Sequence, residues 1–295
     1  MGALLALHSL AEKIFDCIYV FGDNLEVIDD FQVVTKKINS LLQLKEEHKG
    51  NDLYNLDGKI IFSNVSIYVA SKVILRNVNF SIDSGEKVAI IGANGSGKSI
   101  LVKTILGFYK YEGNIYINNH NIKRLNKEDI RKYVELILGE SYMFSGSLLE
   151  NIELDNNKTI EHIDKIAKEC DIKEDIERFE NGYDTLIGER GTKLSGGQKQ
   201  RVCIARSLVN DKSILILDEA LNKLDNRTRS NVLNNLVNIY RNKTMIFISN
   251  DLEIINYVDS IIYIDGITTV MGKHSDLMEH NRNYSNLINI SKDII

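Results

Sequence analysis

One short segment combines glycines, a lysine and a hydroxyl group in the spacing of a phosphate-binding loop. Residues 92–99 read GANGSGKS and fit the pattern GxxxxGK[ST]. They follow an apolar run at 87–92, which is typical of a buried strand, and open a helix expected at 98–106. Successive backbone N–H groups of such a loop point at phosphates, and the start of the helix adds partial positive charge. The residues predicted to contact a nucleotide here are Gly92, Asn94, Gly95, Ser96, Gly97, Lys98, Ser99 and Ile100.

A second segment supplies the acidic groups that a metal-assisted reaction needs. Four apolar residues at 214–217 end in Asp218 and Glu219. We expect Lys98 to lie along the phosphates as a point charge and the Ser99 hydroxyl to ligate Mg²⁺. Asp218 would accept hydrogen bonds from the water shell of the metal, and Glu219 would act as general base on the attacking water. The two segments together predict ATP or GTP binding with Mg²⁺.

The segment between these two elements indicates a family. Residues 194–201 read LSGGQKQR, and here the chain resembles the ATP-binding domains of ABC transporters, whose signature is LSGGQ. The resemblance implies that ATP is the nucleotide. It also implies that two such domains enclose two ATP molecules head to tail, so that each signature closes over the phosphate loop of the other subunit. The signature residues expected to contact that ATP are Ser195, Gly196, Gly197 and Gln198.

Further matches cover roughly residues 58–278 and favour an exporter over an importer or a DNA-repair ATPase. Residues 144–152 (FSGSLLENI) and the loop at 182–191 resemble those of exporter domains. Residues 1–47 resemble the last membrane-spanning helix and linker of peptide and bacteriocin (lantibiotic) exporters. The resemblance implies a second nucleotide-binding domain and a transmembrane permease as partners. It implies a location at the cytoplasmic face of the cell membrane and export of a peptide or bacteriocin-like cargo.

Two positions near the γ-phosphate depart from the family pattern. The glutamine that normally ligates Mg²⁺ falls at Gly139, and the neighbouring Glu140 is the substitute oxygen ligand that we expect. The switch histidine falls at Asn250, whose amide can donate a hydrogen bond but cannot carry positive charge. Asp251 beside it is expected to worsen the local field. Losing one preorganised contact of this kind typically lowers turnover by about 10²–10³, so we predict retained binding and slowed hydrolysis.

Two further departures lie at the adenine and in the loop after the acidic pair. The adenine-stacking aromatic falls on Val69, with Tyr68 one position early, and Asn222-Lys223 replaces the usual Ser-Ala pair. We interpret Tyr68 as the adenine contact.

Several functions remain compatible with this pattern. The first is an ATP-hydrolysing subunit of an exporter. The second is a catalytically impaired domain that binds ATP in a heterodimer and completes a partner's active site with its own intact signature. A homodimer would have two impaired sites, and a truncated copy would no longer transport. An ABC ATPase of translation or DNA repair is disfavoured by the single nucleotide domain and the exporter-type loops.

The elements that position these residues follow from hydrophobic periodicity. Segments 59–69 and 74–82 alternate apolar and polar residues, which predicts an antiparallel pair. Buried strands at 87–92, 213–219 and 244–249 alternate with helices, which predicts a mostly parallel sheet covered on both faces. The fold class is therefore α/β. The resemblance refines it to an ABC-type nucleotide-binding domain with a mixed central sheet, an antiparallel β subdomain and a helical subdomain, preceded by N-terminal helices.

The N-terminal region differs in character from the rest. Charges at Glu12, Lys13 and Asp16 interrupt the apolar run of residues 1–21, which argues against a spanning helix. Helical spacing of apolar residues at 25–44 predicts one or two amphipathic helices to about Lys45, followed by a solvated linker at 45–52. We assign residues 1–50 to a membrane-proximal helical segment, a remnant of a transmembrane domain, and 51–295 to the ABC domain. A helix packed on its own domain and a partner-binding helix remain alternatives.

Composition excludes several other classes. Lys and Arg number 36 against 41 Asp and Glu, which gives a net charge of −5. The chain therefore has no excess of positive charge to neutralise the phosphates of a nucleic acid, and DNA or RNA binding is disfavoured. Three distant cysteines without CxxC spacing indicate neither a disulfide framework nor a zinc site.

Overall fold

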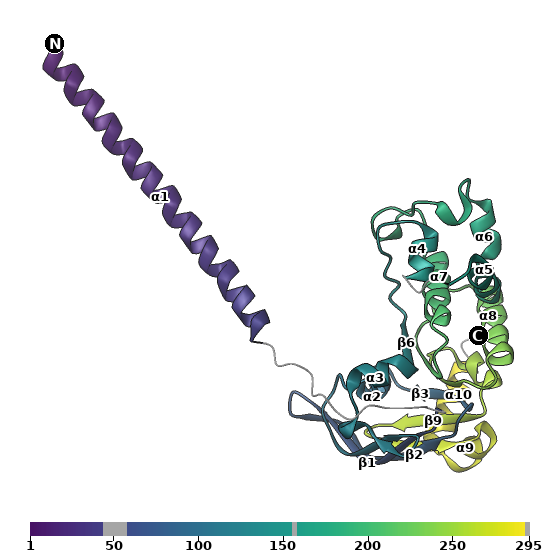
Figure 1. Ribbon diagram of the computed structural model, residues 1–295. Coiled ribbons are helices and arrows are strands. Elements are labelled where there is room, and N and C mark those ends of the chain that lie inside the picture. The colour runs from purple at the N-terminus through teal and green to yellow at the C-terminus, as the bar shows by residue number, and fades with distance from the viewer. Residues whose placement is uncertain (44–57, 155–157, 293–295) are drawn as a thin grey trace. The chain divides into compact units, whose positions relative to one another are not determined.

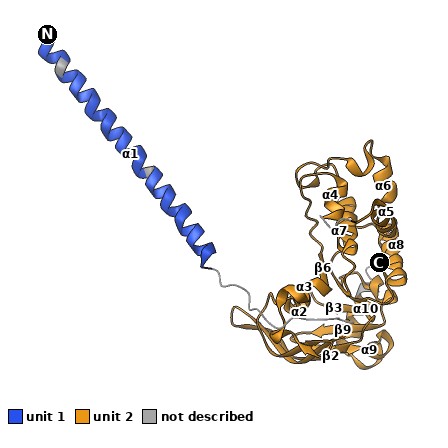
Figure 2. Ribbon diagram, in the orientation of Figure 1, with its two compact units in different colours: residues 1–48 blue, residues 49–295 orange. Residues whose placement is uncertain are grey.

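The computed structural model describes residues 1–43, 58–154 and 158–292 (Figure 1). The chain divides into two compact units, Met1–His48 and Lys49–Ile295 (Figure 2). The predicted domain boundary at residue 50 and the predicted linker at 45–52 lie outside the described residues. Each unit is therefore described by itself.

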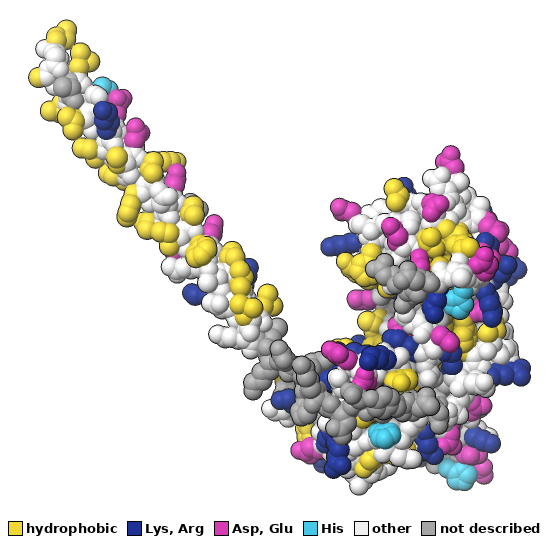
Figure 3. Space-filling model, in the orientation of Figure 1, with side chains coloured by type: hydrophobic (Ala, Val, Ile, Leu, Met, Phe, Trp, Pro, Cys, Tyr) yellow, Lys and Arg dark blue, Asp and Glu magenta, His cyan; other side chains and the backbone are white. Residues whose placement is uncertain are grey.

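The first unit is a single helix, α1 (Gly2–Leu42). Large apolar side chains are exposed along it, and Figure 3 shows them on the visible face. Residues 18–21 are four consecutive exposed apolar residues, so this part of the helix is apolar on more than one face. Among the described residues, no helix combines the length and the apolar character needed to cross a bilayer.

The second unit contains two sheets. The first has four antiparallel strands in the order β2-β1-β4-β5, and the second has six strands in the order β10-β9-β3-β8-β7-β6. In the six-stranded sheet only the pairing of β10 with β9 is antiparallel, so the sheet is mixed. The strands are β1 (Ile60–Val69), β2 (Lys72–Ile82), β3 (Lys87–Gly92), β4 (Tyr111–Ile117), β5 (His120–Asn121), β6 (Val134–Leu138), β7 (Ile214–Asp218), β8 (Thr244–Ile248), β9 (Ser260–Asp265) and β10 (Thr268–Gly272).

Helices cover the sheets and build a separate subdomain. Figure 1 shows α4 to α7 grouped beyond the edge of the six-stranded sheet, in teal and green. The α-helices of this unit are α2 (Lys98–Ile105), α3 (Lys127–Tyr133), α4 (Leu148–Glu153), α5 (Ile160–Glu169), α6 (Lys173–Arg178), α7 (Gly196–Val209), α8 (Asn226–Ile239), α9 (His274–His280) and α10 (Arg282–Lys292). Short 3₁₀ helices are η1 (Ile122–Arg124), η2 (Gly182–Asp184), η3 (Glu189–Gly191) and η4 (Leu252–Tyr257).

The six-stranded sheet is apolar on both faces because two cores pack against it. In β3, Val88 and Ile90 belong to a core shared with the antiparallel sheet and α2. Ala89 and Ile91 belong to the opposite core, shared with α5, α7 and α8. Side chains alternate between faces along a strand, so a continuous apolar run is what a strand between two cores requires. The predicted α/β class, with a mixed sheet, an antiparallel sheet and helices, is confirmed.

Candidate nucleotide-binding site

The phosphate loop joins the end of β3 to the start of α2. Gly95 and Gly97 have φ of +76° and +98°, a region that glycine adopts without strain. A Cβ on Gly97 would also lie 2.7 Å from Cγ2 of Ile74 in β2. Gly97 is the N-cap of α2, whose first N–H groups have no partner within the helix. The loop therefore presents backbone donors and a helix N-terminus on one side, as an anion site requires.

Lys98 is held inside this loop. Its Nζ donates to the carbonyl oxygens of Gly92 at 2.8 Å and Ala93 at 3.1 Å. Burial lowers the pKa of Lys98, and the nearby carboxylates of Glu219 and Asp218 act in the opposite direction. The ammonium group is thus part of the loop and close to the two acidic residues.

An orphaned hydroxyl tests whether the loop fits a phosphate. The Oγ atom of Ser96 is buried and has no hydrogen-bond partner. A buried polar group without a partner costs free energy, about 1–3 kcal/mol. A phosphate oxygen would accept its hydrogen, so the residues present fit a bound polyphosphate.

Hard oxygen ligands meet beside the loop. Ser99 Oγ donates to Asp218 Oδ1 at 2.6 Å, and Asp218 is 5% exposed. A cavity of about 540 Å³ is lined by both residues, and Glu140 and Glu219 also line it. No three acidic, histidine or cysteine side chains in the described parts of the chain form a metal-binding group. The donor set suits Mg²⁺, which takes few protein ligands and completes its shell with water and phosphate oxygens.

Glu219 follows directly after β7 in a restricted conformation. Its φ is +56°, and its N–H donates to the carbonyl oxygen of Ile248 at 2.9 Å. Its carboxylate accepts from Asn250 Nδ2 at 3.3 Å and from Asn222 Nδ2 at 3.4 Å. Two loops, one after β7 and one after β8, therefore hold this carboxylate at the rim of the cavity.

The segment at 194–201 forms the start of α7. Ser195 Oγ accepts from the N–H of Gln198 at 3.2 Å, and Gln198 Oε1 accepts from the N–H of Ser195 at 2.9 Å. This capping box orients the first turn. Gln198 Nε2 donates to Asp175 of α6 at 2.9 Å, so its side chain is fully engaged. The N–H groups of Gly196 and Gly197 lie in the first turn, which has no intrahelical acceptors for them.

Comparisons with known proteins agree with this geometry. A protein-family model described as "ABC transporter" matches residues 75–222, about half of the chain. The chain belongs to the ABC transporter family. Its nucleotide-binding fold is of the exporter type, because it matches a bacterial Atm1-family ABC exporter with ATP bound at a TM-score of 0.79 and 30% identity. That match covers 90% of this chain and 48% of the exporter chain.

Curated relatives from distant organisms have similar levels of sequence identity to this chain. It is 33% identical over 299 residues to "ABC transporter ATM1" of Plasmodium falciparum, covering 90% of this chain and 28% of the relative. It is 33% identical over 267 residues to the transport/processing ATP-binding protein ComA of Streptococcus pneumoniae, covering 88% and 37%. It is 34% identical over 268 residues to the pediocin PA-1 transport/processing protein PedD of Pediococcus acidilactici, covering 87% and 37%. The chain thus spans less than half the length of these relatives.

Three of the positions that we interpret as departures from the ABC pattern lie near Glu219. Gly139 donates its N–H to the carbonyl oxygen of Asp218 at 2.8 Å, and a Cβ on Gly139 would lie 2.9 Å from the carbonyl oxygen of Glu219. Asn222 and Asn250 are the two amides on the Glu219 carboxylate. Gly139 and Asn250 are distant from Glu219 in sequence, so sequence reasoning singled out each position and missed that both lie near this glutamate.

Asp251 does not face the site as an unpaired charge. It forms an ion pair with Arg229 of α8, and its Oδ1 accepts from the N–H of Glu253 at 2.9 Å. Arg229 also donates to the carbonyl oxygen of Leu224 at 2.9 Å. The expectation that Asp251 worsens the field at Asn250 is therefore wrong, because Arg229 offsets that charge.

The remaining predicted contacts differ in what their side chains do. Ile100 is partly buried against the apolar core, so only its backbone is suited to face a phosphate. Asn94 is exposed in the loop. Tyr68 in β1 donates its hydroxyl to Glu112 Oε2 at 3.1 Å, and this hydrogen bond raises the pKa of Tyr68. Tyr68 pairs with Val73, the neighbour of Ile74, which packs at the phosphate loop.

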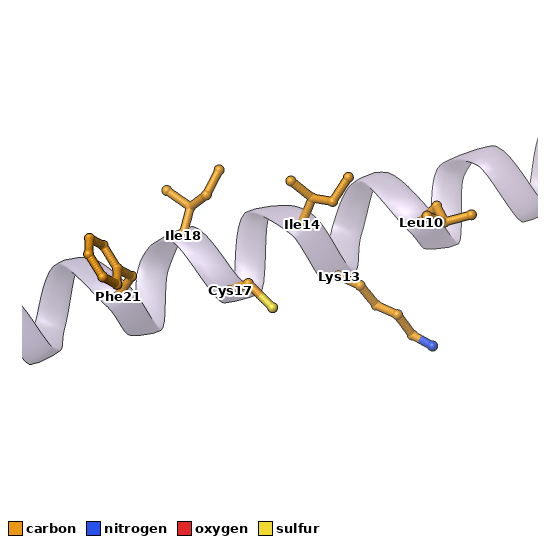
Figure 4. Close-up of a pocket in the computed structure, with 6 residues that line it drawn as sticks. All are labelled: Leu10, Lys13, Ile14, Cys17, Ile18 and Phe21. Atoms are coloured by element: carbon orange, nitrogen blue, oxygen red, sulfur yellow. The ribbon is translucent and has the colours of Figure 1, made fainter.

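A second hollow lies on α1, and it does not resemble a nucleotide-binding site. Figure 4 shows that its lining side chains all extend from one helix. The hollow is the open space between neighbouring side chains on a helix surface. Its lining residues are Leu10, Lys13, Ile14, Cys17, Ile18 and Phe21.

Proposed function

We propose that residues 51–295 bind ATP with Mg²⁺ and hydrolyse it slowly as the nucleotide-binding domain of an ABC exporter. The observation that carries this proposal is the contact of Ser99 with Asp218 beside the intact phosphate loop. It joins the residues expected to hold the metal to those expected to hold the phosphates.

Each residue has a distinct role in this proposal. Lys98, Ser96 and the N–H groups at the start of α2 bind the phosphates. Ser99 and Asp218 hold Mg²⁺, with Glu140 as a further oxygen ligand on the exposed side of the cavity. Bound Mg²⁺ would neutralise charge that develops on the transferring phosphoryl group. Glu219 accepts a proton from the attacking water. Tyr68 stacks on the adenine.

The proposal of slow turnover is based on the residues at two positions near the expected γ-phosphate. Gly139 has no side chain to ligate the metal, and Asn250 offers a neutral donor where a charged one would stabilise the transition state better. Each lost contact of this kind typically lowers the turnover rate by a factor of about 10²–10³. Nucleotide binding depends on the phosphate loop and does not need either position.

The signature segment supports a second nucleotide-binding domain as partner. No hydrogen bond or ion pair within the described residues joins 195–198 to 92–99. The first-turn N–H groups of Gly196 and Gly197 would therefore serve a phosphate on another subunit. Closing and opening of such a pair would be transmitted to a transmembrane permease at the cytoplasmic face of the cell membrane.

The proposed cargo is a peptide or bacteriocin-like molecule. This rests on the resemblance of residues 1–47 to the last membrane-spanning helix and linker of peptide and bacteriocin exporters, while the loops at 144–152 and 182–191 indicate an exporter in general. Relatives with similar identity include an iron–sulfur clusters transporter of Oryzias latipes and a leukotoxin export protein of Aggregatibacter actinomycetemcomitans. Similarity of the nucleotide-binding domain therefore does not discriminate between cargos.

A second candidate is a domain that binds ATP but scarcely hydrolyses it within a heterodimer. The close approach of Gly139 to Glu219, together with the intact signature, favours this candidate. In that arrangement the active site would combine this chain's signature with the partner's phosphate loop.

Two measurements on the purified chain test these proposals. Equilibrium titration with a fluorescent ATP analogue and Mg²⁺ should show saturable binding, and its absence would contradict both candidates. Steady-state ATP hydrolysis by the chain alone supports the first candidate. Hydrolysis that appears only when a co-purifying exporter subunit is added supports the second.

A further inference from the structure

A lysine of α2 lies against the carboxylate expected to hold the metal. Lys103 Nζ is 3.4 Å from Asp218 Oδ2, while Ser99 occupies the other oxygen, Oδ1. The Lys103 side chain is 29% exposed and the Asp218 side chain 6% exposed. The pair is therefore partly shielded from water, where a charge interaction is stronger than on an open surface.

The helix itself brings these groups together. Ser99 and Lys103 are four residues apart, so they lie one above the other on the same face of α2. The opposite side of α2 is fixed in the core through Leu101, Val102 and Ile105. This packing directs the Ser99–Lys103 face toward the end of β7.

Lys103 also lines the cavity that contains Glu140 and Glu219. Gly139 lines the same cavity and contributes no side chain. An ammonium group and Mg²⁺ have the same sign of charge, so a metal ion at Asp218 is repelled by the lysine or must displace it. The Lys103 ammonium would then have to give up its pairing with Oδ2.

We propose that Lys103 is an internal counter-cation for Asp218 that weakens the affinity of this site for the divalent metal. ATP binding here consequently depends less on Mg²⁺ than it would with a neutral residue at position 103. The inference rests on the proposed binding of ATP and Mg²⁺ at the phosphate loop, and it concerns binding alone, so it needs no hydrolysis.

The test is metal affinity in the nucleotide complex. Lys103→Met keeps much of the length of the side chain and removes the charge, and Lys103→Gln is a second neutral variant. Mn²⁺ binding in the presence of ATP is followed by electron paramagnetic resonance, and binding of a fluorescent ATP analogue is titrated with Mg²⁺ and with EDTA. Both neutral variants should bind Mn²⁺ about threefold to tenfold more tightly than the natural chain. They should also gain more nucleotide affinity from added Mg²⁺.

Two controls separate charge from structure. Lys103→Arg retains the charge and should behave like the natural chain, and so should Lys110→Met, which removes an exposed lysine beyond the end of α2. Thermal melting shows whether each variant is folded. Unchanged or weaker Mn²⁺ affinity in folded neutral variants would overturn the inference and leave the proposed function intact. Failure of the natural chain to bind the ATP analogue with Mg²⁺ would overturn the proposed function, and the inference with it.

Discussion

The two ends of the candidate nucleotide site differ in the groups that surround their key residues. At the phosphate loop, Lys98 and the left-handed glycines have the surroundings that the motif requires. At the end of β7, Asn222 and Asn250 donate to the Glu219 carboxylate, and a Cβ on Gly139 would lie 2.9 Å from the Glu219 carbonyl oxygen. We propose that nucleotide binding depends mainly on the first region and hydrolysis on the second. Under this proposal, a sequence change near Glu219 can alter hydrolysis and leave binding intact.

The largest expected effect is on hydrolysis. Glu219→Gln should lower ATP turnover by about 10²–10³, because the amide cannot accept a proton from water. Nucleotide affinity should change by less than about threefold, since Glu219 is outside the phosphate loop. Turnover is measured by phosphate release under saturating ATP and Mg²⁺. Undiminished turnover would show that the proposed base is wrong.

The next largest effect is on binding. Lys98→Ala should weaken ATP affinity about tenfold to a hundredfold, because charge-assisted hydrogen bonds contribute about 1.5–3 kcal/mol. Fluorescence titration measures it, with Lys110→Ala as the matched control for loss of a lysine. An affinity within threefold of the natural value would remove the distinction between the two regions.

Restoring a glutamine at position 139 should not restore activity. In Gly139→Gln the new Cβ would lie 2.9 Å from the Glu219 carbonyl oxygen, so the backbone must shift. Overpacking of this kind typically costs about 1–3 kcal/mol, which lowers the melting temperature by several degrees. Gly139→Ala carries the same Cβ and should lower the melting temperature by a similar amount. A gain in turnover with unchanged melting temperature would show that Gly139 alone limits hydrolysis.

The smallest expected effect follows from the switch position. Asn250→His should raise turnover, but by less than about tenfold, because Gly139 still lacks a ligand and the contact with Glu219 is changed at the same time. Asn250→Gln retains an amide and serves as the control. A rise of a hundredfold or more would mean that position 250 by itself explains the slow turnover that we propose.

The sequence allowed much of the fold to be predicted. The apolar run at 87–92 and the helix after the glycines appear as β3 and α2, and the alternating segments pair as β1 and β2. These predictions succeed because strand and helix periodicity and glycine turns act over a few neighbouring residues. The N-terminal helix was also predicted, and the structure makes it one helix, α1.

Contacts between distant segments could not be predicted in this way. The pairing of Asp251 with Arg229 offsets the negative charge that was expected to act on Asn250. The pairing of Lys103 with Asp218 joins residues on a helix and a strand that are more than a hundred positions apart. A sequence motif indicates the role of a residue, but it does not show which distant residues lie next to it in the fold.

The sequence by itself determined the phosphate loop, the acidic pair at the end of β7 and the signature, because each is a local arrangement of backbone and charge. Only the tertiary structure decided that Gly139 and Asn250 lie near Glu219 and that Lys103 reaches Asp218. The physical reason is that strands β6, β7 and β8 lie side by side in one parallel sheet. Their carboxyl ends therefore meet at one edge of the sheet, where loops distant in sequence come together.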